Sequence, residues 1–419
     1  MGPNAVAILV GARLVTRSND TEFRFRQDSD FWYLTGFGHP DAVAVLRTSS
    51  DNAYTLFVQP REPEAEVWTG IRPGVDGALA DYAADEAHPI GELMQRLPDL
   101  LKGAKRVYHV LGRDPAIDRK LVEVQEDLRR RSRAGLSPAT ELIDPRTLVH
   151  EMRLFKEPAE LDIMRRGAAI TCEAHAEAAR LAFAGHHEYE LEAVLDYTYR
   201  RHGGSGPAYA SIVGGGRNAA VLHYITNDLP LVDGELVLID SGSELEGYAS
   251  DVTRTYPVGG RFEGERLAVY QVVLAAQEAA LEASGPGVTL EDVHDAALRS
   301  LVEGMVDISL LTGSVDELIA TDSYRPYYMH RTSHWLGLDV HDAGAYAKDE
   351  KARPLEPGMV FTVEPGIYIA ADAEGADERF RGIGVRIEDD VVVTDHGIEN
   401  LTAAIPTQPG DVEAWVKAG

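Results

Sequence analysis

The sequence contains a single cysteine, Cys172, so no disulfide can form within the chain. This scarcity fits a reducing compartment, and we expect a cytoplasmic protein. No apolar run approaches the roughly 20 residues that cross a bilayer, so no membrane span is predicted. The N-terminal run AVAILV has no Lys or Arg before it and no convincing cleavage site after it, which favours a first strand over a signal peptide.

Basic residues are few relative to acidic ones, with 40 Lys and Arg against 68 Asp and Glu and a formal net charge of −28. Such an excess argues against a nucleic-acid partner, because phosphate binding needs a basic surface. The motif HEXXH is missing as well, which excludes the zinc peptidase site that two histidines form on one helix. An acidic surface accounts for most of the charge, and a cation site is compatible with it.

With 419 residues, 44% of them hydrophobic, the chain is long enough for two packed domains. Residues 1–149 alternate short strand-like runs with helical segments, which predicts a small α/β domain. The turn-rich segment 137–145 is interpreted as the start of a linker. Residues 150–419 contain two long helices, beginning at Pro158 and at about Glu263, and several strands, which predicts an α+β domain with antiparallel strands.

Four acidic residues interrupt the strand-like runs of the second domain. Asp240 ends the run VLI, and Asp251 lies eleven residues later in YASDVTRTY, so a hairpin would bring both carboxylates together. Glu364 lies inside MVFTVEPGIYI, and Glu388 lies inside GVRIEDDVVV. A buried carboxylate without a partner is costly. A bound cation would remove that cost.

Three histidines, His330, His334 and His341, fall within twelve residues of one another, beside Trp335 and Gly337. Each one alone is more often a surface or hydrogen-bonded residue than a ligand, and an isolated His-X3-His pair occurs often by chance. Their density indicates a site.

Two Asp, two Glu and one His form an oxygen-rich ligand set, which suits Mn²⁺ better than a structural zinc. Four carboxylate charges balance two divalent cations. Paired cations of this kind share a water, lower its pKa and polarise a carbonyl, which is hydrolytic chemistry.

In order and context, Asp240, Asp251, His334, Glu364 and Glu388 resemble the five metal ligands of the pita-bread-fold metallopeptidases. This family includes methionine aminopeptidases, prolidases and aminopeptidases P. The segments SNDTEFRFRQDSDFWYLTGFGHPDAV and VHEMRLFKEPAELDIMRR resemble aminopeptidase P, and the N-terminal domain makes a simple methionine aminopeptidase a poor match. The resemblance implies an α/β N-terminal domain followed by a catalytic domain of the creatinase/aminopeptidase, or pita-bread, fold.

The resemblance also implies residue roles. Asp240 and Asp251 would hold one metal and His334 the other, with the four carboxylates sharing ligation between the two. Glu364 would act as general base on the water that bridges the metals. His223, in VLHYITND, would stabilise the polarised carbonyl or the tetrahedral intermediate.

Two further histidines and four other residues match positions around the substrate. His341 would contact the region of the scissile bond, and His330 would line the pocket. The remaining matches, with ligand or substrate contacts implied, are Tyr368, Arg386, Trp68 and Asp20. Trp68 resembles a tryptophan that enters the neighbouring subunit's pocket, so a homodimer or homotetramer is expected.

The predicted activity is hydrolysis of the bond between an N-terminal residue and a following proline, through a hydroxide that bridges two metal ions. Prolidase, which takes only the dipeptide Xaa-Pro, is the alternative, and an inactive peptide-binding relative is a second one. The chain departs from the family at Ile225 and Thr226, where a Glu often follows the His-Tyr pair, so we expect an altered pocket rim with intact chemistry.

Overall fold

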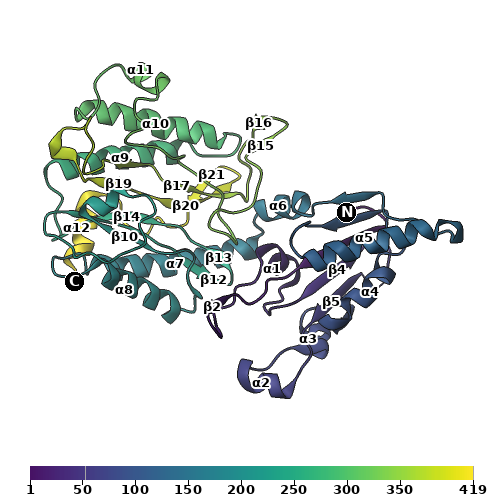
Figure 1. Ribbon diagram of the computed structural model, residues 1–419. Helices are drawn as coiled ribbons and strands as arrows, with labels where there is room; N and C mark the ends of the chain where they lie inside the picture. The colour runs from purple at the N-terminus through teal and green to yellow at the C-terminus, as the bar shows by residue number, and fades with distance from the viewer. Residues whose placement is uncertain (52, 419) are drawn as a thin grey trace. The chain divides into compact units, whose positions relative to one another are not determined.

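The computed structural model describes residues 1–51 and 53–418 and divides into two compact units, Met1–Glu151 and Met152–Gly419 (Figure 1). The boundary falls within helix α6, Arg146–Leu154. None of the helices in these described residues is both long and apolar enough to cross a membrane.

The first unit is built on a six-stranded mixed sheet with the order β6-β5-β4-β1-β7-β8. The strands, in that order, are Glu86–Pro89, Tyr54–Val58, Val43–Arg47, Ala5–Val10, Arg106–His109 and Glu141–Ile143. The helices are α1 (Ser29–Thr35), α2 (Pro63–Thr69), α3 (Gly74–Asp81), α4 (Leu93–Leu100) and α5 (Pro115–Arg130). Strands β2 (Thr16–Ser18) and β3 (Thr21–Glu22) form a separate ladder. The predicted α/β class of this domain is confirmed.

Both faces of this sheet are covered, because alternate residues of each strand point to opposite sides. On one side Val43, Val45 and Phe57 pack with buried leucines of α4 and α5. On the other side Ala44 and Leu56 pack with apolar residues of α1 and α3. The segment 137–145, interpreted from its turn residues as a linker, instead supplies the edge strand β8, because its apolar centre pairs in parallel with β7.

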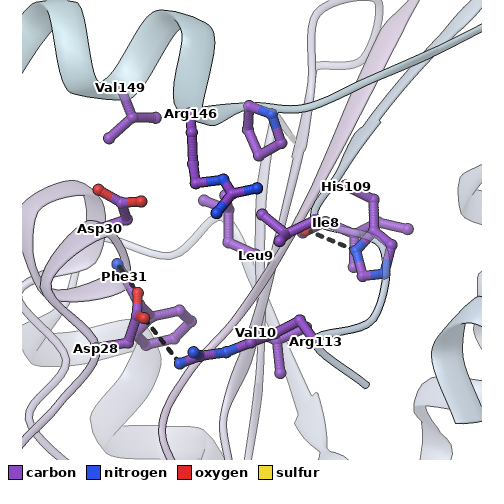
Figure 2. A pocket seen from close by; sticks show the side chains of 12 residues that line it. Ile8, Leu9, Val10, Asp28, Asp30, Phe31, His109, Arg113, Arg146 and Val149 are labelled. Atoms are coloured by element: carbon purple, nitrogen blue, oxygen red, sulfur yellow. Dashed lines mark hydrogen bonds and ion pairs between the residues drawn. The ribbon is translucent and has the colours of Figure 1, made fainter. Parts of the chain in front are cut away.

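The carboxyl ends of the parallel strands β1 and β7 border a cavity of about 120 Å³ (Figure 2). Asp28 on its wall accepts hydrogen bonds from Arg113 Nη2 at 2.7 Å and from Phe31 N at 2.9 Å, and the second of these caps α1. His109 pairs with Asp118 at 2.8 Å. These contacts pair Asp28, Arg113 and His109 on the cavity wall, and they join the start of α1 to the loop that follows β7.

The second unit combines long helices with short antiparallel ladders, as predicted for residues 150–419. Its helices are α7 (Pro158–Ala179), α8 (Glu188–Arg201), α9 (Gly264–Ala283), α10 (Leu290–Asp307), α11 (Val315–Ala320) and α12 (Pro409–Lys417). Helix α7 begins after a capping box between Glu157 and Glu160, with Pro158 in its first turn, as the sequence indicates.

The ladders of the second unit have the orders β10-β11-β14, β13-β12-β9, β17-β20-β21, β18-β19 and β15-β16. The strands are β9 (Gly206–Pro207), β10 (Ile212–Gly215), β11 (Leu236–Asp240), β12 (Ser243–Leu245), β13 (Tyr248–Ala249), β14 (Thr253–Pro257), β15 (Ala347–Lys348), β16 (Lys351–Ala352), β17 (Val360–Val363), β18 (Gly366–Tyr368), β19 (Gly384–Arg386), β20 (Asp389–Thr394) and β21 (Gly397–Asn400). Strands β11 and β14 pair antiparallel, with Asp240 opposite Thr253, so the predicted pairing around Asp240 and Asp251 is confirmed.

His175 on α7 joins that helix to the sheet that carries Asp240. The buried ring donates from Nε2 to the Ser241 carbonyl at 3.0 Å, and Nδ1 accepts from the Tyr256 hydroxyl at 3.2 Å. Burial lowers the pKa of His175 to about 4.

We expect this histidine to make the protein less stable in acid. Between pH 6.5 and about 4 the unfolded chain binds a proton at position 175 that the folded protein excludes, so stability falls as pH falls through this window. The loss approaches about 3 kcal/mol at 1.36 kcal/mol per pKa unit. Urea unfolding at pH 7 and pH 5 measures it, and His175→Gln should show a smaller difference between the two pH values. An equal difference in both proteins would contradict this assignment.

Candidate metal centre

Four acidic residues at or beside strand ends, and one histidine in a loop, come together in the second unit. Asp240 ends β11, and Asp251 precedes β14 by two residues. Glu364 lies between β17 and β18, and Glu388 lies between β19 and β20. His334 lies in the loop between α11 and β15, where its carbonyl accepts from Thr362 N of β17 at 3.0 Å.

The sequence placed Glu364 and Glu388 inside continuous strands, and this detail is wrong. Pro365 follows Glu364 and has no N–H to donate, so the strand breaks there. Glu388 N donates to the Thr253 carbonyl at 3.0 Å, between β19 and β20. Because Glu364 and Glu388 lie between strands, their side chains do not follow the two-sided alternation of a strand. They contact His334 and Thr253, respectively.

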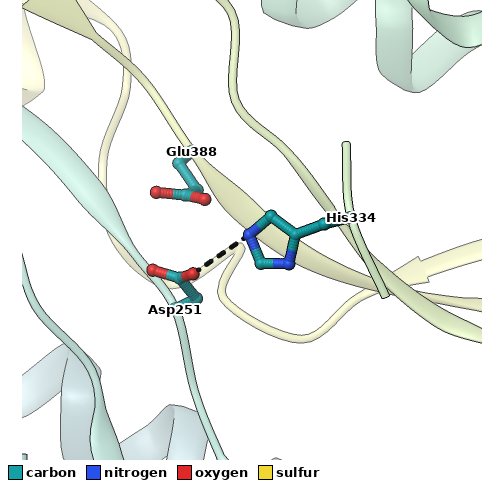
Figure 3. A group of neighbouring side chains, drawn as sticks. All are labelled: Asp251, His334 and Glu388. Atoms are coloured by element: carbon teal, nitrogen blue, oxygen red, sulfur yellow. Dashed lines mark ion pairs between the residues drawn. The ribbon is translucent and has the colours of Figure 1, made fainter. Parts of the chain in front are cut away.

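Asp251, His334 and Glu388 each place one ligand atom within 4.8 Å of the others' (Figure 3). Asp251 Oδ2 lies 3.3 Å from His334 Nε2, and Glu364 Oε1 lies 3.7 Å from the same nitrogen. The Tyr209 hydroxyl contacts carboxylate oxygens of both Asp240, at 2.6 Å, and Asp251. The structure therefore brings all five predicted ligands together.

The ring of the histidine is held in the orientation that a metal ligand needs. His334 Nδ1 donates to the carbonyl of Trp335 at 3.0 Å, which leaves Nε2 facing the carboxylates. Burial alone would lower the pKa of His334, but the hydrogen bond to Asp251 and the charge of Glu364 raise it to about 9.

The carboxylates repel one another. Asp240, Asp251 and Glu388 are 8%, 5% and 2% exposed. Burial, followed by the charges of Asp251 and other neighbouring acids, raises the pKa of Glu388 well above its ordinary value. Burial and the nearby acids likewise raise the pKa of Glu364 to about 7, against the opposing charges of His334 and Arg386. Four acids in one buried place lack enough positive charge, and divalent cations supply it, so the residues fit a metal centre.

A second group of predicted residues adjoins the acids. Arg386 Nη2 contacts Asp240 Oδ2, and its Nη1 donates to the Tyr368 hydroxyl at 3.0 Å. That hydroxyl donates to His330 Nε2 at 2.8 Å, because His330 Nδ1 is directed at the Arg331 carbonyl. A continuous series of polar contacts therefore runs from Asp240 through Arg386 and Tyr368 to His330.

The remaining predicted histidines flank this group. The rings of His341 and His334 meet edge to face, with centroids 4.4 Å apart at 74°. His223 is exposed after the short helix η3, Gly216–Ala220, and its charge acts on the pKa of both His330 and His341. His341 therefore contacts the proposed ligand His334, whereas His223 acts on this group only through its charge.

Trp68 and Asp20 belong to the first unit. Trp68 lies on α2 and is 88% exposed. Asp20 lies in the exposed turn between β2 and β3. Their predicted substrate contacts stay predictions.

Two residues that the sequence did not single out also support the acids. Tyr209, described above, contacts both aspartates from before β10, 31 residues ahead of Asp240. The Thr253 hydroxyl donates to Glu388 Oε2 at 2.6 Å. Nothing in the sequence around Tyr209 indicates this role. Thr253 lies two residues after Asp251, and in an extended segment residues two apart point to the same side, so its proximity to the acids could have been predicted.

Comparison with known proteins agrees with this geometry. Residues 162–395 match the model for metallopeptidase family M24, and residues 1–108 match that for the aminopeptidase P N-terminal domain. The chain belongs to the aminopeptidase P group of family M24. In sequence order it therefore has an aminopeptidase P N-terminal domain followed by a catalytic domain of the pita-bread fold, as the sequence predicts.

Similar aminopeptidases match over nearly the full length. The Xaa-Pro aminopeptidase of Escherichia coli K12 is 46% identical over 100% of this chain and 95% of its own. Xaa-Pro aminopeptidase 3 of Homo sapiens is 34% identical over 98% of this chain and 81% of its own. The structure of a Pseudomonas aeruginosa aminopeptidase superposes with a TM-score of 0.97 at 47% identity, covering 100% of this chain and 95% of that one.

Proposed function

We propose that this protein is a two-metal Xaa-Pro aminopeptidase that releases the N-terminal residue before a proline. The observation that carries the proposal is the cluster of Asp240, Asp251, His334, Glu364 and Glu388, within a chain that matches Xaa-Pro aminopeptidases along nearly its whole length. These five residues would hold two divalent cations. We infer Mn²⁺, which the oxygen-rich ligand set supports.

When bound, such cations act as Lewis acids on a carbonyl and lower the pKa of water. The chain's own residues then orient the peptide and move the proton. Glu364 would accept a proton as general base, and its carboxylate oxygens, each 3.7 Å from a ring nitrogen of His334 or His330, support this role. His223 and His341 would donate hydrogen bonds to the carbonyl oxygen as its charge develops.

The polar chain of Arg386, Tyr368 and His330 supports a role in substrate binding. Arg386 and Tyr368 are 4% and 1% exposed, so their side chains are fixed before substrate arrives. His330 continues this chain on its more accessible side. Proline has no backbone N–H, so it cannot form the hydrogen bond by which general peptidases align their substrates. Fixed side chains that contact the proline ring would align the substrate instead.

Trp68 supports a homodimer or homotetramer in which one subunit contributes to its neighbour's substrate site. With Val67 at 80% and Ile71 at 77% exposed, it forms an apolar patch on and beside α2 that water disfavours. Asp20 is proposed as a first-unit acid that reaches the substrate amine. The single cysteine supports a cytoplasmic location, and the charge of −28 supports neither nucleic acid nor an acidic membrane surface as a partner.

Matched peptides test the proposal. We expect release of Xaa from Xaa-Pro-Yaa in the presence of Mn²⁺, little action on Xaa-Pro, and loss of activity after chelation followed by recovery on adding metal. Cleavage of the dipeptide alone would indicate a prolidase, which the relatives do not favour. Metal binding without cleavage of either peptide would indicate the inactive relative.

A further inference from the structure

Glu188 is a fully buried acid that the mechanism above does not use. It opens helix α8, and its carboxylate accepts hydrogen bonds at both oxygens. Oε1 receives Gly215 N at 2.7 Å and Asn218 Nδ2 at 2.9 Å. Oε2 receives the Tyr224 hydroxyl at 2.8 Å and Leu229 N at 2.9 Å. Four donors occupy the roughly four acceptor positions of an ionised carboxylate.

All four donors belong to one segment, residues 215–229, and they lie on both sides of His223. Asn218 precedes this histidine by five residues, and Tyr224 follows it directly. Gly215 ends β10 and residues 216–220 form the short helix η3, but the rest of the segment has neither helix nor strand, so side-chain contacts help to hold it in place.

Asn227 supplies a second anchor farther along the segment. Its Oδ1 accepts from Val213 N at 3.0 Å, and its Nδ2 donates to the Ser211 carbonyl at 2.9 Å. These bonds hold one side of His223 only. Glu188, in contrast, accepts hydrogen bonds from residues on both sides of His223.

We propose that Glu188 is a positioning residue that sets the place of His223 at the metal centre. The proposal rests on the proposed function, in which His223 acts on the substrate carbonyl. The charge matters as well as the shape. A glutamine offers one acceptor oxygen and turns an N–H₂ group towards two of the four donors, so at least one bond on one side of His223 breaks.

A double-mutant cycle in the metal-loaded, full-length enzyme tests this role. We expect Glu188→Gln to lower kcat on Xaa-Pro-Yaa about 10-fold or more, as misplacement of a reacting group does. Bound metal and KM should stay close to wild type, since the five ligands are untouched. His223→Ala should lower kcat by a larger factor. The double variant should be no slower than His223→Ala alone, because Glu188 acts only through that histidine.

Two controls keep the result interpretable. Glu190→Gln makes the same chemical change on the same helix, at a partly exposed residue that caps α8 by accepting from His187 N at 2.7 Å, and should keep wild-type kcat. If Glu188→Gln does not fold, Tyr224→Phe removes a single donor and should show a smaller loss that also vanishes in the His223→Ala background.

The outcomes are distinct. Losses that multiply in the cycle, or wild-type kcat in folded Glu188→Gln, would overturn the positioning role while leaving the proposed function in place. A wild-type enzyme that cleaves no Xaa-Pro peptide would overturn the proposed function and this inference with it.

Discussion

Replacing Asp251 with alanine is expected to abolish peptidase activity while the protein stays folded. Its carboxylate lies against His334 Nε2 and receives the Tyr209 hydroxyl, so it stands between the histidine and Asp240. Loss of residues that merely support a metal ligand typically lowers activity 10- to 100-fold, so loss of a ligand itself should cost about 1,000-fold or more in kcat/KM. Metal content per chain and kcat/KM on Xaa-Pro-Yaa measure the effect.

Removing this charge should not unfold the chain. Loss of Asp251 relieves repulsion among the four acids, but it also removes the hydrogen bonds from His334 and Tyr209 that lower the pKa of Asp251 against its burial. These effects oppose each other, so the melting temperature of the metal-free protein should stay close to that of wild type. Asp372→Ala changes an exposed aspartate between β18 and β19 and serves as the matched control. Full activity of Asp251→Ala with less than one metal bound per chain would contradict a two-metal mechanism.

The four carboxylates of the proposed ligand set could be singled out from sequence because they carry a local contradiction, whereas the choice of His334 among three histidines came from the family resemblance. Asp240 and Glu388 adjoin apolar runs that fold as buried strands, and a carboxylate in such a place needs compensation. The histidines cluster in sequence as well. Both signals are local, so no knowledge of the fold was needed to see them.

The supporting residues were not predictable in this way. Tyr209 and Glu188 reach their partners across about 30 to 40 residues, and neither interrupts a pattern in its own segment. Likewise the segment that forms β8 was interpreted as a linker, because its turn residues can be recognised in the sequence, whereas its pairing with β7, about 35 residues earlier, cannot. Tertiary contacts decide both cases, and periodicity carries no trace of them.

Arg153, Lys156 and Asp342 form a buried ion cluster next to the loop that carries His334 and His341. Asp342 accepts from Arg153 Nη2 at 2.5 Å and from Lys156 Nζ at 2.9 Å, and the side chains of Lys156 and Asp342 are each 1% exposed. Asp342 N also donates to the Trp335 carbonyl at 2.8 Å, which closes the loop between His334 and His341. Gly337 lies so close to the carboxylate that any Cβ there would overlap Asp342 Oδ2.

We expect Lys156→Met to destabilise the protein by about 3 kcal/mol, because it leaves a buried carboxylate with one cation in place of two. For a unit of this size that corresponds to a melting temperature lower by about 6–12 °C. Burial lowers the pKa of Lys156, against the pull of Asp342, so the pair already carries a desolvation penalty that only mutual contact offsets.

Arg165→Met is the matched control, since Arg165 lies on α7 and pairs with Glu399 at 2.7 Å, but with side chains 44% and 41% exposed. Water screens this pair, so its loss should cost under about 1 kcal/mol. Each variant removes one positive charge. Comparing their free energies of unfolding, by heat and by urea, therefore measures how much burial adds to the contribution of the ion pair. Equal shifts would mean that the cluster beneath the loop holds no more than a surface pair. A larger shift for Lys156→Met, together with lower kcat, would show that the loop carrying His334 and His341 depends on charges that lie outside the catalytic site.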